Sequence, residues 1–305
     1  MHARDYYRKP ASPWPRRALM AVLAIVLVVS MTKLIGYFVS MRQEQALRQE
    51  LTGMLITDAP QTMVPTQPTS EAAPTPTAAQ TPQLRTSLDA FATFTPDPRR
   101  MPEILMTYHA LYERNSDLVG WLNVRALPQV DLPVVQRDHV YYLRRDFYGR
   151  SNMNGTAFMD VSGSIWPRSD NLIIYAHNMK SGEMFGALHK LMDEPFYRET
   201  PLASFNTIYE RANYVPIAVV LCSIHQGEDF FNFHVTDFRS REDFDDYIAR
   251  ARALSSVYPP YDAVYGDQLL TLVTCYDEAN TKRLLVLLRR VRENEDLDEL
   301  AVMWH

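Results

Sequence analysis

The feature that most limits how this chain can fold is a 22-residue apolar run near its N-terminus. From Ala18 to Val39 only Ser30, Thr32 and Lys33 are polar. A helix of this length rises about 33 Å, at ~1.5 Å per residue, which is enough to cross the hydrocarbon core of a bilayer. The run therefore predicts a membrane-spanning helix and confines any folded domain to the residues outside it.

Charged residues on either side of the run predict its orientation. Residues 1–41 hold six basic side chains and one acidic side chain, and basic residues concentrate on the cytoplasmic side of membrane spans. We therefore expect a protein of the cell membrane with a cytoplasmic tail at 1–17, one span at 18–39 and an extracellular remainder. A cleaved signal peptide would have a shorter apolar region and a small-x-small cleavage site. No convincing site of that kind occurs at 36–41.

The extracellular remainder is acidic and poor in cysteine. The whole chain has 31 Lys and Arg against 36 Asp and Glu, and the part after residue 41 keeps 25 basic and 35 acidic side chains, a balance of −10. Nucleic-acid binding requires a basic surface, so nucleic acid is not expected as a partner. Two cysteines are too few for a disulfide framework or a Cys-rich zinc module.

Residues 40–100 join the span to the rest of the chain. After a short amphipathic stretch at 41–56, residues 57–98 contain eight prolines, ten threonines and no glycine. Such a composition cannot bury enough apolar surface to fold, and proline favours extended polyproline geometry. We expect a semi-rigid spacer that holds a domain away from the membrane. The alternative, a featureless linker, would differ little in function.

The remaining residues, 101–305, are long enough for one domain. Short apolar runs in this domain predict strands at 132–136, 155–160, 171–176, 214–224, 269–275 and 283–291. These strands are many and short, and they do not alternate strictly with helices. The pattern predicts a mainly β domain, either a barrel or a sandwich, with decorating helices.

Three segments of this domain carry helical patterns. The first begins at Pro102, which suits a first helical turn, and continues to residue 122. The second covers 184–192. The third covers 240–255 and begins with Ser240 and Asp243 in the arrangement of a capping box.

Three polar residues stand at the ends of apolar runs. Cys275 ends one run just before the polar loop 276–282, and Arg283 opens the run that follows this loop. If the two runs form a hairpin, the arginine lies beside the thiol, where its charge favours the thiolate and can hold a developing oxyanion. His177 ends another run, and a cysteine–histidine pair is the minimal apparatus for acyl transfer by a thiol.

Each of these residues also has an ordinary structural interpretation. A single cysteine in a strand is commonly a small core residue. One of eight histidines usually packs or lies at the surface, and an arginine that opens a strand is usually a solvated charge. Spacing alone therefore leaves the three residues open between catalysis and structure.

Longer motifs surround these residues. TLVTC at 271–275 is followed by Arg283, and NLIIYAHNMKSGEMFGAL at 171–188 contains His177. Others are DLVGWLNV at 117–124, LPVVQRDHVYYL at 132–143 and GTAFMD at 155–160. The first motif resembles the TLxTC…R signature of the sortases, and the second resembles the strand, catalytic histidine and following helix of class B sortases. The resemblance covers residues 103–291, and the combination of motifs is highly specific.

This resemblance implies a fold and a set of partners. Class B sortases have an eight-stranded β-barrel with an N-terminal helical pair and a long helix before the last barrel strands, which 240–255 fits. The family consists of membrane-anchored transpeptidases of Gram-positive bacteria. They cleave a sorting motif after Thr and join the new carboxyl to an amine of the cell envelope. The implied partners are surface proteins with sorting motifs, an amine of a peptidoglycan precursor or a pilin, and the lipid bilayer, with no cofactor.

Residue by residue, the resemblance implies a catalytic site and a groove. The catalytic positions fall on Cys275 as nucleophile, His177 as acid and base, and Arg283 as oxyanion donor. Three more residues are implied to bind substrate: Tyr175, Leu143 and Thr274. For Tyr175 and Leu143 a packing role is the alternative.

Three positions depart from the class B pattern. Ala176 stands where Gly usually precedes the histidine, Val273 where Ser is common, and His139 where Asn is frequent. These changes keep the implied catalytic residues and leave the exact sorting motif open. Two other functions remain: a membrane-anchored cysteine hydrolase on the same scaffold, and a catalytically silent cell-surface binding module.

Two other groups of residues resemble functional sites. Cys222 has His225 three residues later, but residues three apart on a strand point to opposite faces, so we expect a buried structural thiol. A Cys222–Cys275 disulfide would consume the nucleophile. The acidic run 242–246 lacks the spaced oxygen ligands and glycine of a calcium loop. Acids in a first helical turn are the simpler explanation, and no metal site is expected.

Overall fold

The computed structural model describes residues 14–55, 101–199, 202–277 and 279–303. Most of the predicted cytoplasmic tail and all of the predicted Pro/Thr-rich spacer lie outside these residues.

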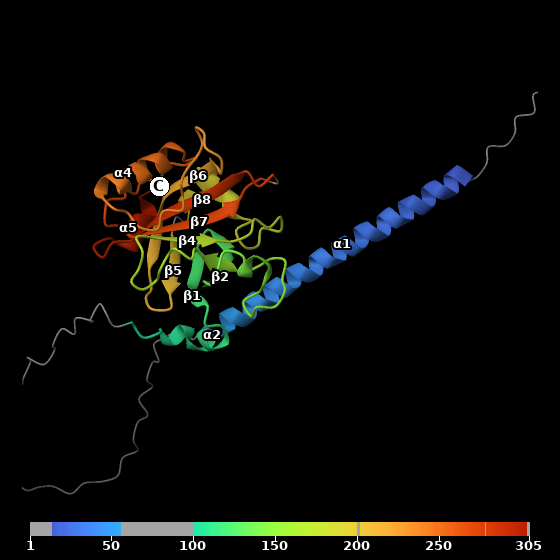
Figure 1. Cartoon of the computed structure of the whole chain (residues 1–305), viewed down its shortest axis with the longest axis horizontal. Coiled ribbons are helices and arrows are strands. Elements are labelled where there is room, and N and C mark those ends of the chain that lie inside the picture. Colours follow the sequence, from blue (N-terminus) through green and yellow to red (C-terminus); the bar gives the residue numbers. More distant parts are fainter. Residues whose placement is uncertain (1–13, 56–100, 200–201, 278, 304–305) are drawn as a thin grey trace, which may run out of the picture.

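Eight strands close into one barrel (Figure 1). They are β1 (Leu118–Val124), β2 (Leu127–Val135), β3 (Ala157–Met159), β4 (Asn171–Tyr175), β5 (Ala203–Thr207), β6 (Asn213–Ser223), β7 (Leu269–Cys275) and β8 (Lys282–Arg290). The order around the barrel is β1-β2-β3-β4-β7-β8-β6-β5, and β5 pairs with β1 to close it. The pairs β2–β3 and β4–β7 are parallel and the others antiparallel. The predicted barrel is therefore confirmed, and the sandwich is excluded.

Strands β4, β7 and β8 are buried on both faces. Leu270 and Leu272 of β7 belong to the large hydrophobic cluster that also contains Leu122 of β1 and Val134 of β2. Leu269 and Val273, which alternate with them, pack in a second cluster with residues of α4 (Arg241–Ala253). Because both faces are covered, these strands appear in the sequence as continuous apolar runs rather than alternating ones.

Strand β1 replaces the second half of the helix predicted at 102–122. The helical part consists of η2 (Met106–Tyr108) and α2 (His109–Arg114), and β1 begins at Leu118. At Gly120 a Cβ would overlap the backbone of β5 at Asn206. The glycine is therefore needed for the close approach of the two strands, and its neighbours are extended because they pair on both sides.

Apart from α1 (Trp14–Gly53) and α4, the other helices are short. They are η3 (Tyr141–Arg144), η4 (Leu188–Met192), α3 (Glu194–Glu199) and α5 (Leu297–Val302). The segment predicted as helical at 184–192 thus contains only the 3₁₀ helix η4. The predicted start of α4 is confirmed, because the hydroxyl of Ser240 accepts a hydrogen bond of 3.2 Å from the backbone N–H of Asp243.

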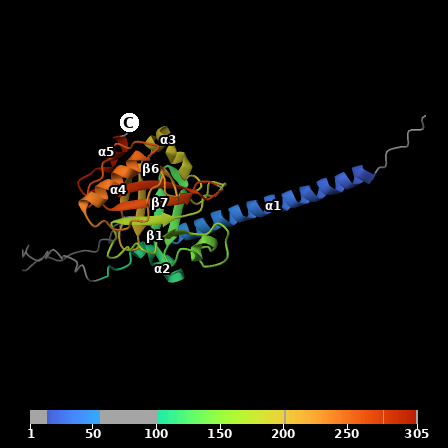
Figure 2. The same ribbon diagram turned by 45° about the horizontal axis from the view of Figure 1, so that its top comes forward.

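Helix α1 (Trp14–Gly53) projects from the barrel beside β2 and α2, as Figures 1 and 2 show from two directions. Among the described residues it is the one helix whose length and composition suit a membrane span, and its large apolar side chains from Leu19 to Val39 are exposed. The helix continues beyond that apolar run, and Leu51 near its end is buried against the barrel. The amphipathic stretch at 41–56 is therefore, as far as Gly53, part of α1 and docked on the domain.

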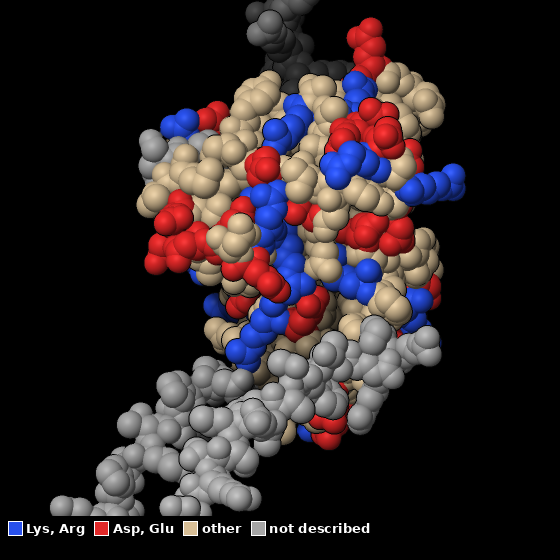
Figure 3. Space-filling view, turned by 90° about the vertical axis from the view of Figure 1, so that its left-hand side faces the viewer, with Lys and Arg blue, Asp and Glu red and all other residues tan. Residues whose placement is uncertain are grey.

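A network of ion pairs ties the C-terminal segment to the barrel. The guanidinium of Arg289 is almost fully buried and makes two hydrogen bonds of 2.6 Å to the carboxylate of Glu295. Arg292 pairs with Asp267 at 2.8 Å. Such paired charges indicate a structural role for this network. Figure 3 shows acidic and basic side chains interspersed over the face turned away from the projecting end of α1.

Candidate active site

The β7–β8 hairpin brings a thiol and a guanidinium together. Cys275 is the last residue of β7, and its partner across the hairpin is Arg283, the second residue of β8. Directly opposed residues of antiparallel strands point to the same face. The loop of seven residues between them thus returns the chain in the register that the sequence predicted.

The parallel pairing of β4 with β7 brings the histidine to the same place. Tyr175 of β4 pairs with Val273 of β7, and the N–H of Ala176 donates to the carbonyl of Val273 at 3.3 Å. His177 lies two residues beyond Tyr175, and Cys275 lies two residues beyond its partner Val273. The two side chains therefore leave neighbouring strands at the same level and on the same face.

A backbone carbonyl fixes the orientation of the imidazole. Nε2 of His177 lies 2.7 Å from the carbonyl oxygen of Leu143, so this nitrogen carries the proton in a hydrogen bond. Gly155 packs against that carbonyl: its φ is +66°, and a Cβ there would lie 2.8 Å from the Leu143 oxygen and 2.6 Å from the Tyr142 oxygen. The carbonyl of Leu143, a residue predicted to bind substrate, therefore positions the histidine.

The carboxylate of Asp277 holds the loop that precedes Arg283. It accepts hydrogen bonds from the backbone N–H groups of Thr281 and Lys282 at 2.8 and 2.9 Å, and the bond from the Thr281 hydroxyl is the main reason that its pKa is lowered. Nη1 of Arg283 donates to the carbonyls of Lys282 and Asn280 at 3.1 and 3.3 Å. The turn therefore orients the guanidinium, which has five N–H donors in all.

All three predicted catalytic residues line one groove with a volume of about 560 Å³. The three positions that depart from the class B pattern also line it: His139, Ala176 and Val273. Its apolar walls include Phe158, Phe233 and Ile224. A groove of this size, with mainly apolar walls and a few polar groups, is typical of a ligand-binding site.

Tyr175 lines the groove and is anchored by a buried acid. Its hydroxyl donates to Asp160 at 2.8 Å and lies 3.3 Å from Nδ1 of His234, while its ring stacks on Phe158. Burial and the hydrogen bond to Asp160 raise the pKa of Tyr175. Burial alone would raise the pKa of Asp160, but hydrogen bonds to its carboxylate outweigh this effect and lower it.

Asp160 and His234 were not among the predicted site residues. Asp160 ends the run GTAFMD, and a charged residue at the end of an apolar run is the signal that could have identified it. His234 follows β6 in a segment that forms neither helix nor strand, although apolar and polar residues alternate along 231–236. No local pattern could place it opposite Tyr175.

The buried acid gives a pH-dependent prediction. Replacing Asp160 with Asn should lower the free energy of unfolding near pH 7 by about 1–3 kcal/mol, because Tyr175 loses a charged acceptor. The folded-state pKa of Asp160 is lowered, so the carboxylate stabilises the fold above its ordinary pKa, about 3.9, and this contribution is lost as pH falls toward the folded-state value. In urea unfolding, the difference between wild type and variant should shrink below about pH 4. Asp245→Asn, on the exposed face of α4, is the control. A difference that is independent of pH would contradict the prediction.

Thr274, predicted to bind substrate, is buried, and its hydroxyl donates to the carbonyl of Ala176 at 2.8 Å. This bond joins the ends of β4 and β7 just before the histidine and the cysteine. The observed contact of the hydroxyl is therefore with the residue that precedes His177.

The second cysteine lies in a different environment. Cys222 is fully buried, and burial raises the pKa of its thiol to about 11, so the neutral form dominates at pH 7. Its partner residue is Arg283, across the other edge of β8. Two strand spacings of about 4.8 Å therefore separate it from Cys275, which is beyond the roughly 7 Å limit for a disulfide. Both cysteines are free.

The acidic run at 242–246 forms the exposed start of α4. The pKa of Glu242 is lowered by hydrogen bonds, first from its own backbone N–H and then from Ser240. Within the described part of the chain, no group of three or more His, Cys, Asp or Glu side chains is arranged to hold a metal ion.

Comparison with known proteins identifies the family. The model of the sortase domain matches residues 122–291, more than half of the chain. Sortase B of Listeria monocytogenes is 32% identical over 178 residues, which cover 57% of this chain and 68% of that protein. Sortase B of Staphylococcus aureus is 24% identical over 188 residues, covering 61% and 75%.

Solved structures show the same fold. A protein of Bacillus anthracis described as similar to sortase B aligns with a TM-score of 0.56 at 29% identity, covering 63% of this chain and 86% of that one. The complex of S. aureus sortase B with a substrate aligns with a TM-score of 0.57 at 22% identity, covering 63% and 88%. With its closed barrel and its Cys–His–Arg groove, the chain belongs to the sortase family of transpeptidases, as an enzyme of class B.

Proposed function

We propose that this enzyme cleaves a C-terminal sorting motif after Thr and transfers the new carboxyl to an amine, with Cys275, His177 and Arg283 as its catalytic residues. The observation that carries the proposal is the convergence of these side chains on one groove, from β7, from β8 and from the segment directly after β4. The substrate is a surface protein that bears the motif. The acceptor is an amine of a peptidoglycan precursor or of a pilin.

The first half-reaction forms a thioester. The thiolate of Cys275 attacks the carbonyl carbon of Thr, and the negative charge that develops on the carbonyl oxygen is held by N–H donors of Arg283. The imidazolium of His177 then gives its proton to the departing amine nitrogen as the C–N bond breaks. The products are a thioacyl enzyme and a free amine-terminated peptide.

The second half-reaction reverses these roles. An acceptor amine attacks the thioester carbonyl and loses its proton to His177, and the Cys275 thiolate leaves. Water in place of the amine would give hydrolysis. The apolar walls of the groove favour the amine, since they reduce the water beside the thioester.

Arg283 provides a prediction about geometry rather than charge. Replacement by Lys keeps the positive charge but loses the planar fork of donors, so kcat should fall about 10²-fold, as expected when an oxyanion donor is removed. The turnover of a quenched sorting-motif peptide measures this. Arg290→Lys, at the other end of β8, is the matched control. If Arg283→Lys retains wild-type kcat, the oxyanion role is wrong.

The overall proposal is tested with the full chain in detergent and a panel of quenched sorting-motif peptides. Each peptide is incubated with and without an amine acceptor, and the products are identified by mass spectrometry. A Cys275-dependent, acceptor-linked product supports the transpeptidase. Cleavage without a joined product across several acceptors would support the hydrolase instead. An enzyme that cleaves no peptide and whose Cys275 is no more reactive toward alkylation than Cys222 would be the silent binding module.

We also propose that the apolar part of α1 anchors the enzyme in the cell membrane, with its N-terminus in the cytoplasm and the barrel outside. The exposure of this apolar segment supports the anchor, and the basic residues before it support the orientation. Labelling of Cys275 in intact cells by a membrane-impermeant thiol reagent tests it. Labelling only after the cells are opened would reverse the orientation.

A further inference from the structure

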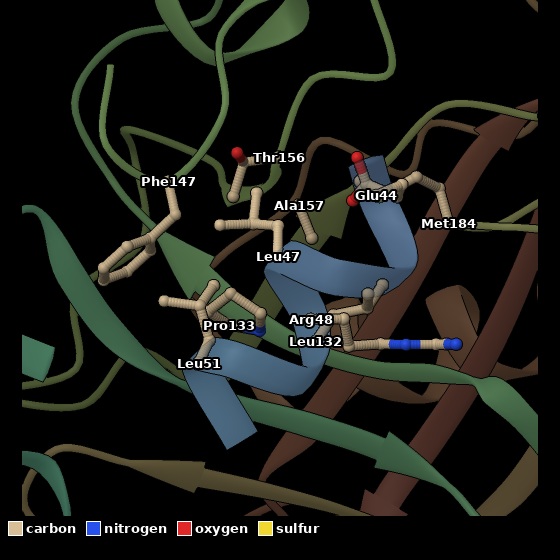
Figure 4. Close-up of a pocket in the computed structure, with 10 residues that line it drawn as sticks. All are labelled: Glu44, Leu47, Arg48, Leu51, Leu132, Pro133, Phe147, Thr156, Ala157 and Met184. Carbon is tan, nitrogen blue, oxygen red and sulfur yellow. The ribbon is translucent and has the colours of Figure 1, made fainter. Parts of the chain in front are cut away.

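The end of α1 presents one face to the barrel. Glu44, Leu47, Arg48 and Leu51 are spaced three, four and seven residues apart and so share a face of the helix. Figure 4 shows this face lying over residues of β2, β3 and two loops: Leu132, Pro133, Phe147, Thr156, Ala157 and Met184. More than 50 residues of sequence separate this face from α2, so its contacts, rather than chain continuity, hold it in place.

The first of the two loops, residues 145–156, directly follows η3, whose Leu143 carbonyl orients His177. Side-chain amides of Asn152 and Asn154 donate to the carboxylate of Glu44 at 3.2 and 3.4 Å. Glu44 is 6% exposed. Burial raises the pKa of its carboxyl, although the hydrogen bonds from the two amides oppose the rise. The backbone N–H of Asn152 in turn donates to the carbonyl of Arg144 at 3.0 Å, directly after Leu143. Glu44 therefore holds the loop that places the Leu143 carbonyl.

The second loop begins at His177 itself. The N–H of Phe185 donates to the carbonyl of His177 at 3.0 Å and closes the loop. Just before that closure, the carboxylate of Glu183 lies 3.5 Å from Arg48 and accepts a hydrogen bond of 3.4 Å from Gln45. Met184 has φ +53° and is buried against α1, a conformation that a non-glycine residue keeps only when its surroundings hold it.

We propose that the docked end of α1 positions His177 for catalysis, with Glu44, Gln45 and Arg48 acting through the two loops. None of these three side chains lines the catalytic groove, so they are positioning residues rather than catalytic ones. The inference rests on the proposed function, in which His177 transfers protons. A helix that continues into the apolar anchor segment is thereby part of the apparatus that aligns the site.

The test compares variants of the full chain in detergent. Glu44→Ala combined with Arg48→Ala should lower kcat about tenfold or more and change KM less than about twofold, because misplacement of a catalytic group by a fraction of an ångström slows chemistry more than binding. Glu44→Gln keeps an oxygen acceptor for Asn152 and should retain kcat. Gln49→Ala, on the exposed side of the same turn, is the matched control.

A second readout separates positioning from loss of stability. Amide hydrogen exchange should become faster at 141–155 and 177–185 in the Glu44→Ala, Arg48→Ala double variant and stay unchanged in β7 and β8. Leu300→Ala, a destabilising change in α5, should lower kcat only in proportion to the unfolded fraction. If the double variant behaves like Leu300→Ala, or if its loops loosen while kcat is unchanged, the positioning role is wrong.

The same experiments distinguish this inference from the proposed function. A wild-type enzyme without Cys275-dependent turnover would refute the proposed function, whatever the exchange rates are. Normal wild-type turnover with no effect of the double variant on kcat would leave the proposed function intact and refute the positioning role.

Discussion

Replacing Cys275 with alanine is expected to lower kcat/KM for a sorting-motif peptide by about 10⁴-fold or more. The reaction as proposed passes through a thioester, so without the sulfur no acyl enzyme can form. Removal of the nucleophile from a group of catalytic residues lowers the rate by a factor of this order. The measurement is the initial rate with a quenched peptide, together with the mass of the enzyme after it is mixed with substrate. Wild type should gain the mass of the acyl group, and the variant should not.

The protein provides its own control for this experiment. Cys222→Ala removes the other thiol, which is buried with its pKa raised to about 11, and should leave kcat near the wild-type value. Some loss of stability is expected, since the sulfur packs in the cluster beneath α4. If Cys222→Ala loses turnover while it remains folded, the assignment of the nucleophile to Cys275 is wrong.

The position of Arg283 opposite Cys275 followed from sequence because it depends on few residues. Two apolar runs separated by a loop of seven mostly polar residues form a hairpin, and the loop length then sets which residues face each other. The strands β7 and β8 are covered on both sides, so their apolar runs were long and clear. By contrast, β5 has the sequence ASFNT, with alternating partly exposed residues, and no strand was predicted there.

The support of the site could not be predicted in the same way. The acceptor for His177 is a backbone carbonyl, and a backbone group leaves no signature in the residue type of Leu143. The role of Glu44 depends on contacts with Asn152 and Asn154, which lie 108 and 110 residues away in sequence. The amphipathic stretch at 41–56 was recognised, but periodicity reveals only that a helix has an apolar face, not which surface covers it.

Replacing His177 with alanine is expected to lower kcat/KM by about 10³-fold. The departing amine is a poor leaving group unless it is protonated, and the acceptor amine must lose a proton in the second half-reaction, so both steps require the imidazole. Because the thiol remains, the variant should still be alkylated at Cys275. The measurement pairs peptide turnover with this alkylation, and His109→Ala, which changes an exposed histidine of α2, is the control.

Added imidazole makes this prediction specific. If the space left by the side chain admits free imidazole, turnover of His177→Ala should rise with imidazole concentration, whereas that of Cys275→Ala should not. The rise should be larger with an amine acceptor present, since both proton transfers are then restored. A His177→Ala variant that is folded and turns over peptide at the wild-type rate would show that the proton transfers use another group. His139 and His234 would then be the residues to replace, because their imidazoles line the same groove.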